Sequence, residues 1–150
     1  MVHVSDCVRF SQTFHWFTTN LWIWGFRPSA KSVGDVRKLW QEDPAKHEMI
    51  FSQIGESVKQ ARQAIQNGEI ELLGQLMNRN HTLLRELTVS SRELDQLCEA
   101  ALLGGAYGAK LSGGGRGGNM IALTSPKRAA IVMNALSKAG AKQTFQTQVH

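Results

Sequence analysis

A glycine-rich run, Gly-Gly-Gly-Arg-Gly-Gly at residues 113–118, constrains this chain more than any other feature. It separates two short apolar runs, so it predicts a loop between two strands. Five glycines in six positions cost backbone entropy on folding. They also allow positive φ at successive residues and let main-chain N–H groups point into one concavity, where they bind phosphate. The run therefore indicates either a phosphate-binding loop or a mobile hairpin tip.

The candidate phosphate site comprises this loop and the serine that precedes it: Ser112, Gly113, Gly114, Gly115, Arg116, Gly117 and Gly118. The Arg116 guanidinium offers a fork of N–H donors that matches phosphate oxygens. We expect Arg116 to be exposed and to contribute about 1 kcal/mol or less to phosphate binding at physiological salt. The main-chain N–H groups are then expected to contribute more to phosphate binding than the Arg116 side chain does. The Ser112 hydroxyl stands at the mouth of the loop, where it can serve a phosphate or simply a neighbouring backbone group.

The distribution of charge places a positive field around the loop. Residues 1–99 carry 11 basic and 12 acidic groups, a net charge of −1, whereas residues 100–150 carry six basic groups and no acidic one. A positive field suits a polyanion, either the phosphates of a nucleotide or a nucleic-acid backbone. A solvated basic surface is the alternative that charge alone leaves open.

Length and composition indicate one domain with a modest core. The chain has 150 residues, of which 42% are hydrophobic and 19% charged, so disorder is not indicated. Its two cysteines, Cys7 and Cys98, lie far apart without a CxxC pattern, which favours a reduced, cytoplasmic protein. The five histidines show no metal-ligand spacing, so no metal site is predicted.

Hydrophobic spacing and capping residues predict the order of elements from residue 29 onward. Asp43 and Pro44 begin a helix that Gly68 ends. Ser90 and Glu93 match a capping box at the start of a later helix. From residue 29 a short helix is marked by Val33, Val36 and Trp40. Further helices are predicted at about 44–67, 69–87, 90–103 and 125–139, and strands at about 107–112, 119–124 and 141–149. This order predicts an α+β fold, with helices layered on one face of a small antiparallel sheet.

Acidic and histidine side chains outside the loop show no catalytic pattern. Glu93, Asp95 and Glu99 lie on one predicted helix, and no histidine or serine is placed to complete a hydrolytic site. We therefore interpret them as solvated or capping charges. His81 falls near the polar edge of the helix over 69–87 and is interpreted as structural, and the leucine and methionine stripe of that helix as core.

The loop and its flanks carry a family resemblance. Residues 110–123, Lys-Leu-Ser-Gly-Gly-Gly-Arg-Gly-Gly-Asn-Met-Ile-Ala-Leu, resemble the third conserved motif of the GHMP kinases. Three further stretches are similar to the mevalonate kinases within that superfamily: residues 34–40, 73–87 and 89–97. Arg116 departs from the motif, where glycine is usual, and Asn119 stands where cysteine or another small residue is usual. The resemblance covers residues 29–149, which correspond to the C-terminal half of such an enzyme.

The resemblance implies a GHMP kinase C-terminal domain, with a ferredoxin-like arrangement, over residues 29–150. It implies an intact parent enzyme that transfers the γ-phosphate of ATP to a hydroxyl of mevalonate, with Mg²⁺, in cytoplasmic isoprenoid biosynthesis. Residues 112–118 would then help to hold the phosphates, and Lys110, Asn80 and His81 would lie near the substrate. A homodimer is left open as the assembly.

The resemblance implies, too, which parts of an active site lie elsewhere. In GHMP kinases the adenine site, the main phosphate loop of the Gly-Leu-Gly-Ser-Ser type and the catalytic aspartate belong to the N-terminal half. Residues 113–118 are the one glycine-rich phosphate loop of this sequence, and no acidic residue stands out as a base. We therefore assign no catalytic residue and expect activity to need a family-like N-terminal half as a partner.

Residues 1–28 do not fit the family pattern. They hold three of the four tryptophans and four of the six phenylalanines of the chain. Their apolar stretch, residues 14–26, is too short to span a membrane and lacks the features of a signal peptide. The family has a strand of small and β-branched residues at this point. We therefore interpret residues 1–28 as a truncated or frameshifted start, in which that strand is lost or replaced.

Three alternatives stay open. Phosphomevalonate kinase, or another GHMP kinase of small alcohols, shares the resemblance. A non-catalytic module would bind nucleotides or RNA through the basic face, but a KH-type Gly-x-x-Gly loop matches poorly because residues 113–118 lie between predicted strands. Nucleic acid is therefore disfavoured as a partner. A purely structural domain would use the tryptophan-rich residues 1–27 as its contact surface.

Overall fold

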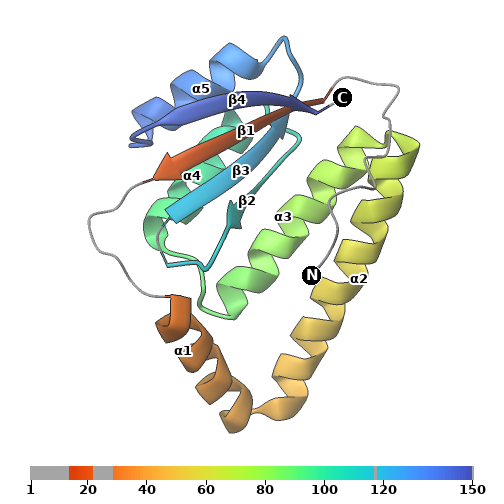
Figure 1. The fold of residues 1–150 in the computed structure, drawn as a ribbon, viewed down its shortest axis with the longest axis vertical. Coiled ribbons are helices and arrows are strands. Elements are labelled where there is room, and N and C mark those ends of the chain that lie inside the picture. Colours follow the sequence, from red (N-terminus) through yellow and green to blue (C-terminus); the bar gives the residue numbers. More distant parts are fainter. Residues whose placement is uncertain (1–13, 22–28, 117, 150) are drawn as a thin grey trace.

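The computed structural model of the chain describes residues 14–21, 29–116 and 118–149 (Figure 1). Its elements follow in the order β1 (Phe14–Leu21), α1 (Ser29–Glu42), α2 (Pro44–Asn67), α3 (Ile70–Glu86), α4 (Arg92–Leu103), β2 (Gly108–Ser112), β3 (Gly118–Thr124), α5 (Ala129–Lys138) and β4 (Thr144–Val149). Within these residues, no helix combines the length and the apolar composition needed to span a membrane. The predicted order of four helices, two strands, a helix and a strand from residue 29 onward is confirmed.

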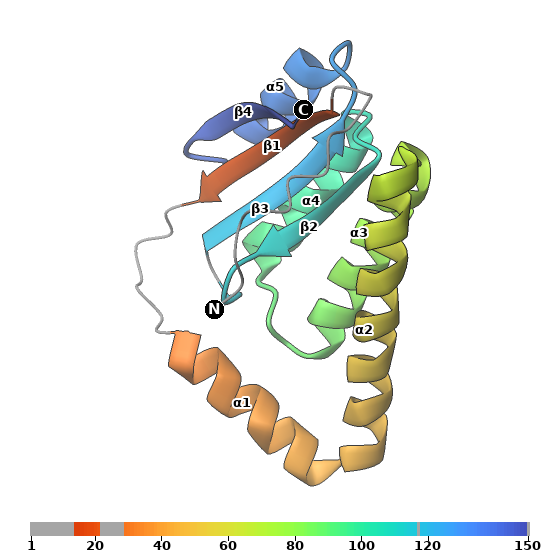
Figure 2. The same cartoon turned by 45° about the vertical axis from the view of Figure 1, so that its right-hand side comes forward.

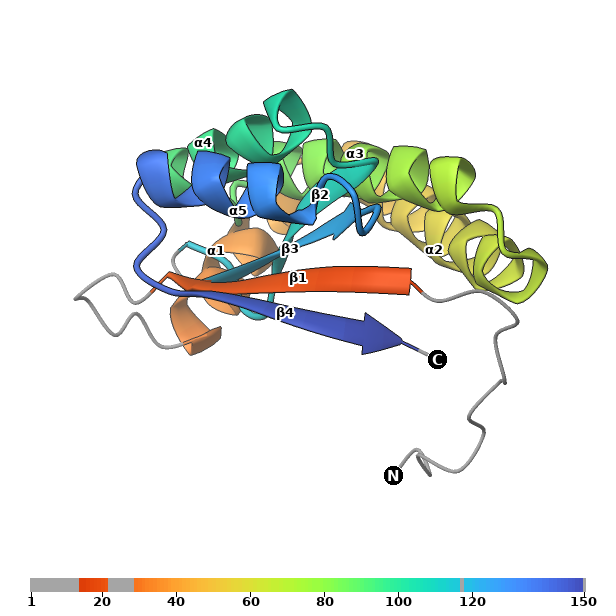
Figure 3. The ribbon, with the colours of Figure 1, turned by 90° about the horizontal axis from the view of Figure 1, so that it is seen from above.

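The four strands form one antiparallel sheet in the order β2-β3-β1-β4. β1 is a central strand, because Phe17 lies opposite Ala122 of β3 on one side and Gln146 of β4 on the other. Helices α4 and α5 lie on one face of the sheet, and Figure 3 shows both above it. The predicted α+β fold, with helices on one face of a small antiparallel sheet, is therefore confirmed.

The strand at residues 14–21 changes the interpretation of residues 1–28. A strand is present at this point, because β1 occupies the position between β3 and β4. Ladder hydrogen bonds join main-chain groups, so an unusual sequence can still fill a central position. Replacement of the family strand by different residues stays a prediction. Residues 1–13 and 22–28 lie outside the described part of the chain.

Helix α2 begins and ends where its local signals predict. The Asp43 carboxylate accepts the N–H of Lys46 at 3.1 Å, and Pro44 occupies the first turn, where it needs no N–H partner. Gly68 follows the last turn with a φ of 72° and donates its N–H to the end of the helix. Glycine adopts this left-handed conformation without a Cβ clash. Both predicted ends are therefore confirmed.

The predicted capping serine of α4 is wrong by one residue. The helix is capped by Ser91, whose hydroxyl oxygen accepts the N–H of Leu94 at 3.3 Å. Ser90 instead donates its hydroxyl to the Asp95 carboxylate at 2.6 Å. Ser91 thus caps the helix, and Ser90 binds the Asp95 carboxylate.

The starts of α5 and β4 also differ from the prediction. Residues 125–128 form a turn, in which the Arg128 N–H donates to the Ser125 carbonyl at 3.0 Å, and α5 begins only at Ala129. β4 begins at Thr144 rather than at residue 141. Proline suits a turn as well as the first position of a helix, so this boundary depends on the chain around it.

Helix α3 lies along the edge of β2, and the two main chains touch (Figure 2). A Cβ on Gly74 would lie 2.4 Å from the Tyr107 carbonyl oxygen, and one on Gly108 would lie 2.2 Å from the Gly74 carbonyl oxygen. The Asn78 amide accepts the N–H of Ala109 at 2.9 Å and donates to the Tyr107 carbonyl at 3.4 Å. An edge strand otherwise leaves such groups unpaired. The Asn78 side chain therefore forms the hydrogen bonds with the main chain of this edge that a neighbouring strand would otherwise form.

The core consists of three clusters of buried side chains. The first lies between the sheet and helices α4 and α5, and includes Leu94, Leu97, Ala109, Leu111, Met120, Ala122, Val132 and Leu136. The second joins α2 and α3 to β3, and comprises Ala64, Leu73, Leu76, Met77 and Leu123. The third comprises Ile50, Leu83 and Leu87, with Val36 of α1 packed against it. The leucine and methionine stripe predicted as core on α3 is confirmed.

Candidate functional site

The glycine loop joins β2 to β3, and the last residue pair before it is Ser112 opposite Asn119. Its described residues adopt several left-handed conformations. The positive φ values are 94° at Gly113, 77° at Gly115, 51° at Arg116 and 125° at Gly118. The run therefore adopts the positive φ values that its glycines allow. Arg116 pays a steric cost there, because it is the one residue of the four with a Cβ.

The loop is docked on the turn between α3 and α4. The Arg116 N–H donates to the Val89 carbonyl at 2.6 Å. A Cβ on Gly115 would lie 2.2 Å from the same carbonyl oxygen, so only glycine allows this approach. This contact fixes the tip of the loop against the helical layer. A free hairpin tip would have no such contact.

The Arg116 side chain anchors the loop further, and the expectation that it is exposed is wrong. Its Nε and Nη2 atoms donate to the Thr88 carbonyl and hydroxyl at 2.7 and 2.9 Å. Its Nη1 atom pairs with the Asp35 carboxylate of α1, and the Arg116 side chain is 22% exposed. Figures 1 and 2 show α1 approaching this end of the sheet. Asp35 lies 81 residues before Arg116, so no local pattern pointed to the pair.

Lys110 and Ser112 share one face of β2 beside the loop. Their neighbours Ala109 and Leu111 belong to the core under α4, and side chains alternate along a strand. Both Lys110 and Ser112 are half-buried, and burial lowers the pKa of Lys110. The structure thus places these two predicted residues next to the candidate phosphate loop.

Asn80 and His81 are buried inside the domain. Each is 8% exposed, so the expectation that His81 lies at a polar edge of its helix is wrong. The His81 Nδ1 atom accepts the N–H of Leu111 at 3.3 Å. The Asn80 Oδ1 atom has no hydrogen-bond partner among the described residues. His81 therefore supports β2 from α3, two residues before the loop begins.

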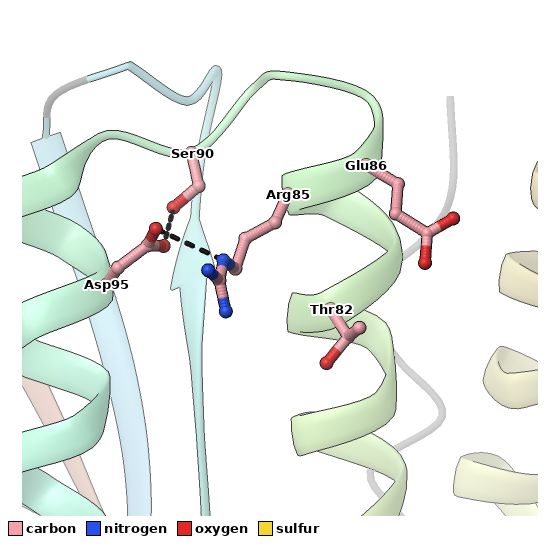
Figure 4. A pocket seen from close by; sticks show the side chains of 5 residues that line it. All are labelled: Thr82, Arg85, Glu86, Ser90 and Asp95. Carbon is pink, nitrogen blue, oxygen red and sulfur yellow. Dashed lines mark hydrogen bonds and ion pairs between the residues drawn. The ribbon is translucent and has the colours of Figure 1, made fainter.

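Asp95 is the centre of a polar cluster that the sequence did not reveal. It accepts from Ser90 at 2.6 Å and pairs with Arg85 at 3.1 Å, as Figure 4 shows. The His81 Nε2 atom lies 3.1 Å from Asp95 Oδ1, without the alignment of a hydrogen bond. The interpretation of Asp95 as a solvated or capping charge is therefore wrong. An open hollow of about 530 Å³ lies beside the cluster, lined by Thr82, Arg85, Glu86, Ser90 and Asp95.

The cluster does not have the geometry of a hydrolytic site. Ser90 donates its proton to Asp95 rather than to a histidine, so it lacks the base that activates a nucleophile. Cys98 lies 3.9 Å from His81 Nδ1, but burial raises the pKa of its thiol to about 12. A thiol with this pKa stays protonated and inert at neutral pH. Asp95 therefore serves to tie α4 to α3.

We predict that the stability of the fold declines below about pH 6.5 because of His81. Burial lowers the pKa of His81 below its ordinary value of 6.5, and Asp95 opposes this only in part, while Arg85 and Lys110 lower it further. The unfolded chain therefore takes up a proton at higher pH than the fold does. Stability from this group is complete above about pH 6.5 and is lost as the pH falls toward the folded pKa.

Urea unfolding at about pH 8 and about pH 5.5 measures this dependence. His81→Asn is the matched variant, since its Oδ1 atom occupies the place of His81 Nδ1 and can accept the N–H of Leu111 but takes up no proton. It should lose less free energy of unfolding between the two pH values than the parent. An equal loss in both proteins would show that other groups cause the dependence.

Comparison with known proteins agrees with this architecture. The family model for the C-terminal region of GHMP kinases matches residues 61–142. The mevalonate kinase of Pyrococcus horikoshii is 42% identical over 113 residues, which cover 72% of this chain and 33% of that protein. The galactokinase of Pyrococcus furiosus is 37% identical over 116 residues, or 73% of this chain and 32% of that protein. The chain thus spans about a third of the length of the curated relatives it matches.

Solved structures give the same result. The L. major mevalonate kinase in complex with R-mevalonate matches with a TM-score of 0.88 and 36% identity, over 95% of this chain and 44% of that chain. The Streptococcus pneumoniae phosphomevalonate kinase matches with a TM-score of 0.78 over 95% of this chain and 41% of that chain, and its 20% identity establishes a shared fold alone. The family predicted from residues 110–123 is therefore confirmed. The chain belongs to the GHMP kinase family and carries its C-terminal domain.

Proposed function

We propose that this chain is the C-terminal domain of a kinase of the mevalonate kinase type. The intact parent would transfer the γ-phosphate of ATP to a hydroxyl of mevalonate, in cytoplasmic isoprenoid biosynthesis. Two findings support this substrate over others of the superfamily: the identity to archaeal mevalonate kinases and the likeness to an enzyme solved with R-mevalonate. The proposed binding of phosphate is supported by the conformation of the glycine loop, residues 113–118.

The observation that carries the proposal is the conformation of the docked loop. Gly113, Gly115 and Gly118 have positive φ, which turns the main chain in the way that gathers N–H groups around an anion. The contact with Val89 holds this shape before any ligand arrives. A preformed site binds more tightly, because the ligand does not have to order the loop.

In this proposal the candidate residues fall into two groups. Ser112 and the loop contact the phosphates, and Lys110, on the same face of β2, lies near the substrate. His81 acts as a positioning residue, since it holds Leu111 just before the loop. Asn80, which is buried in the same helix, belongs to this supporting layer.

The loop does not fit a Mg²⁺ ion. Mg²⁺ prefers oxygen ligands, above all carboxylates, whereas this loop offers N–H donors and the Arg116 guanidinium. The carboxylate that reaches the loop, Asp35, is already paired with Arg116. We therefore place the metal, the adenine site and the catalytic aspartate in a family-like N-terminal half.

We predict that the chain alone does not phosphorylate mevalonate, and that a family-like N-terminal half restores turnover. The test is a coupled assay of ADP release, with mevalonate, on the chain fused behind the N-terminal half of the Pyrococcus horikoshii enzyme. That half alone is the control and should be inactive as well. Phosphorylation by the isolated chain would show that its catalytic machinery lies here. A folded fusion that binds ATP but shows no turnover would contradict the proposed function.

A further inference from the structure

Arg116 is held by partners on two different elements. Its main-chain N–H donates to the Val89 carbonyl at 2.6 Å, and its Nε and Nη2 atoms donate to Thr88 at 2.7 and 2.9 Å. The remaining contact, from Nη1, is to the Asp35 carboxylate. Three of these four contacts therefore belong to the α3–α4 turn, and one belongs to α1.

Asp35 thus has little part in holding the loop in position, and its main effect is on the net charge beside the loop. Without Asp35, the contacts to Thr88 and Val89 would still hold the guanidinium beside the glycines. With Asp35 present, a carboxylate that is only 28% exposed opposes the positive charge. Such a pair is less screened by water and salt than one on the open surface. An anion that approaches the loop must compete with this carboxylate for Nη1.

We propose that Asp35 sets the affinity of the glycine loop for phosphates, by competing with phosphate oxygens for the Nη1 atom of Arg116. This inference rests on the proposed phosphate role of the loop. The ligand class is a di- or triphosphate, whose oxygens match the fork of a guanidinium. Arg116 then binds the ligand without leaving Thr88, and only the α1 carboxylate is displaced.

Helix α1 can release the carboxylate without leaving the domain. Val36, the residue after Asp35, packs against the cluster of Ile50, Leu83 and Leu87. This apolar contact does not involve Arg116, so α1 stays docked when the ion pair opens. The side chain of Asp35 is therefore the part that moves.

Calorimetric titration of the full chain with pyrophosphate tests the inference. Asp35→Asn removes the competing charge and should bind pyrophosphate about three- to tenfold more tightly, the range expected for one neighbouring charge near a surface. Its affinity should also fall more steeply with salt, because the freed guanidinium now contributes. Glu42→Gln is the matched control: it removes the same charge from the last residue of α1, where the side chain is exposed, and should change affinity by less than about twofold.

The outcomes separate this inference from the function on which it rests. If the parent binds pyrophosphate and Asp35→Asn binds it equally or more weakly, Asp35 is not a competitor, and the phosphate role of the loop still stands. If neither protein binds pyrophosphate, both ideas are overturned. Asp35→Ser, which removes the same charge with a smaller side chain, must agree in sign with Asp35→Asn. Adding Arg116→Gln to Asp35→Asn should abolish the gain.

Discussion

Gly74→Ala is expected to lower the free energy of unfolding by about 3 kcal/mol or more, the scale of severe core substitutions. The added Cβ would lie 2.4 Å from the carbonyl oxygen of Tyr107 and 2.5 Å from its carbonyl carbon. Main chain cannot move aside like the end of a side chain. Separation of α3 from β2 would also stretch both hydrogen bonds of Asn78. The helix and the strand must therefore part, or the substitution must be accommodated by a shift of the whole hairpin α2–α3.

Gly55→Ala is the matched control, because it makes the same substitution inside a helix with no atom within 4 Å of the new Cβ. Alanine forms helix better than glycine, so this variant should gain up to about 1 kcal/mol. Gly108→Ala should be as damaging as Gly74→Ala, since its Cβ would lie 2.2 Å from the Gly74 carbonyl oxygen. Urea unfolding followed by circular dichroism compares all three with the parent. Equal stability of Gly55→Ala and Gly74→Ala would mean that α3 and β2 do not touch as described.

Local chemistry explains which parts of this fold are predictable from sequence. The ends of α2 follow from Asp43, Pro44 and Gly68, each of which acts on main-chain groups within one helical turn. The glycine run is equally local, because each positive φ depends on the residue that adopts it. The family motif over residues 110–123 adds information of the same kind. These features needed no knowledge of distant residues.

The predictions that are wrong depend on partners far away in the sequence. The sequence predicts an exposed Arg116, but Asp35 reaches it from α1, and Thr88 from the α3–α4 turn. The helical pattern predicts His81 at a polar edge, but its imidazole accepts the N–H of Leu111, 30 residues further along the chain. Neither composition nor local sequence patterns predict which distant residues pair. A glycine within an otherwise regular helix, Gly74, is a signal that could have pointed to close packing.

Ser90 and Ser91 show how a nearby partner decides between two equal local signals. Both serines have the residue type of a helix cap, and Ser90 with Glu93 even matches the capping box. Asp95 takes the Ser90 hydroxyl, so Ser91 caps the helix. The carboxylate is held in turn by Arg85 of α3. The cap of α4 is thus fixed by tertiary contacts as well as by propensity.

Gly115→Ala is expected to detach the glycine loop from the α3–α4 turn. Its Cβ would lie 2.2 Å from the Val89 carbonyl oxygen, which accepts the Arg116 N–H. The loop can avoid this clash only by giving up that hydrogen bond and the contacts of the guanidinium with Thr88. A positive φ of 77° adds strain for any residue with a Cβ. The combined loss should be about 2–4 kcal/mol of unfolding free energy.

Gly113→Ala is the control that measures the cost of the backbone conformation, so that the rest of the loss in Gly115→Ala is assigned to docking. Gly113 also has a positive φ, at 94°, but no atom lies within 4 Å of its added Cβ. It should therefore lose only about 1 kcal/mol, the cost of the backbone conformation alone. Hydrogen exchange at the Arg116 amide separates the two variants further, because protection should disappear in Gly115→Ala and persist in Gly113→Ala. The proposed phosphate role of the loop depends on its docked shape, so pyrophosphate affinity should fall in step with that protection. Equal losses of stability and protection in both variants would mean that the turn at Val89 does not hold the loop.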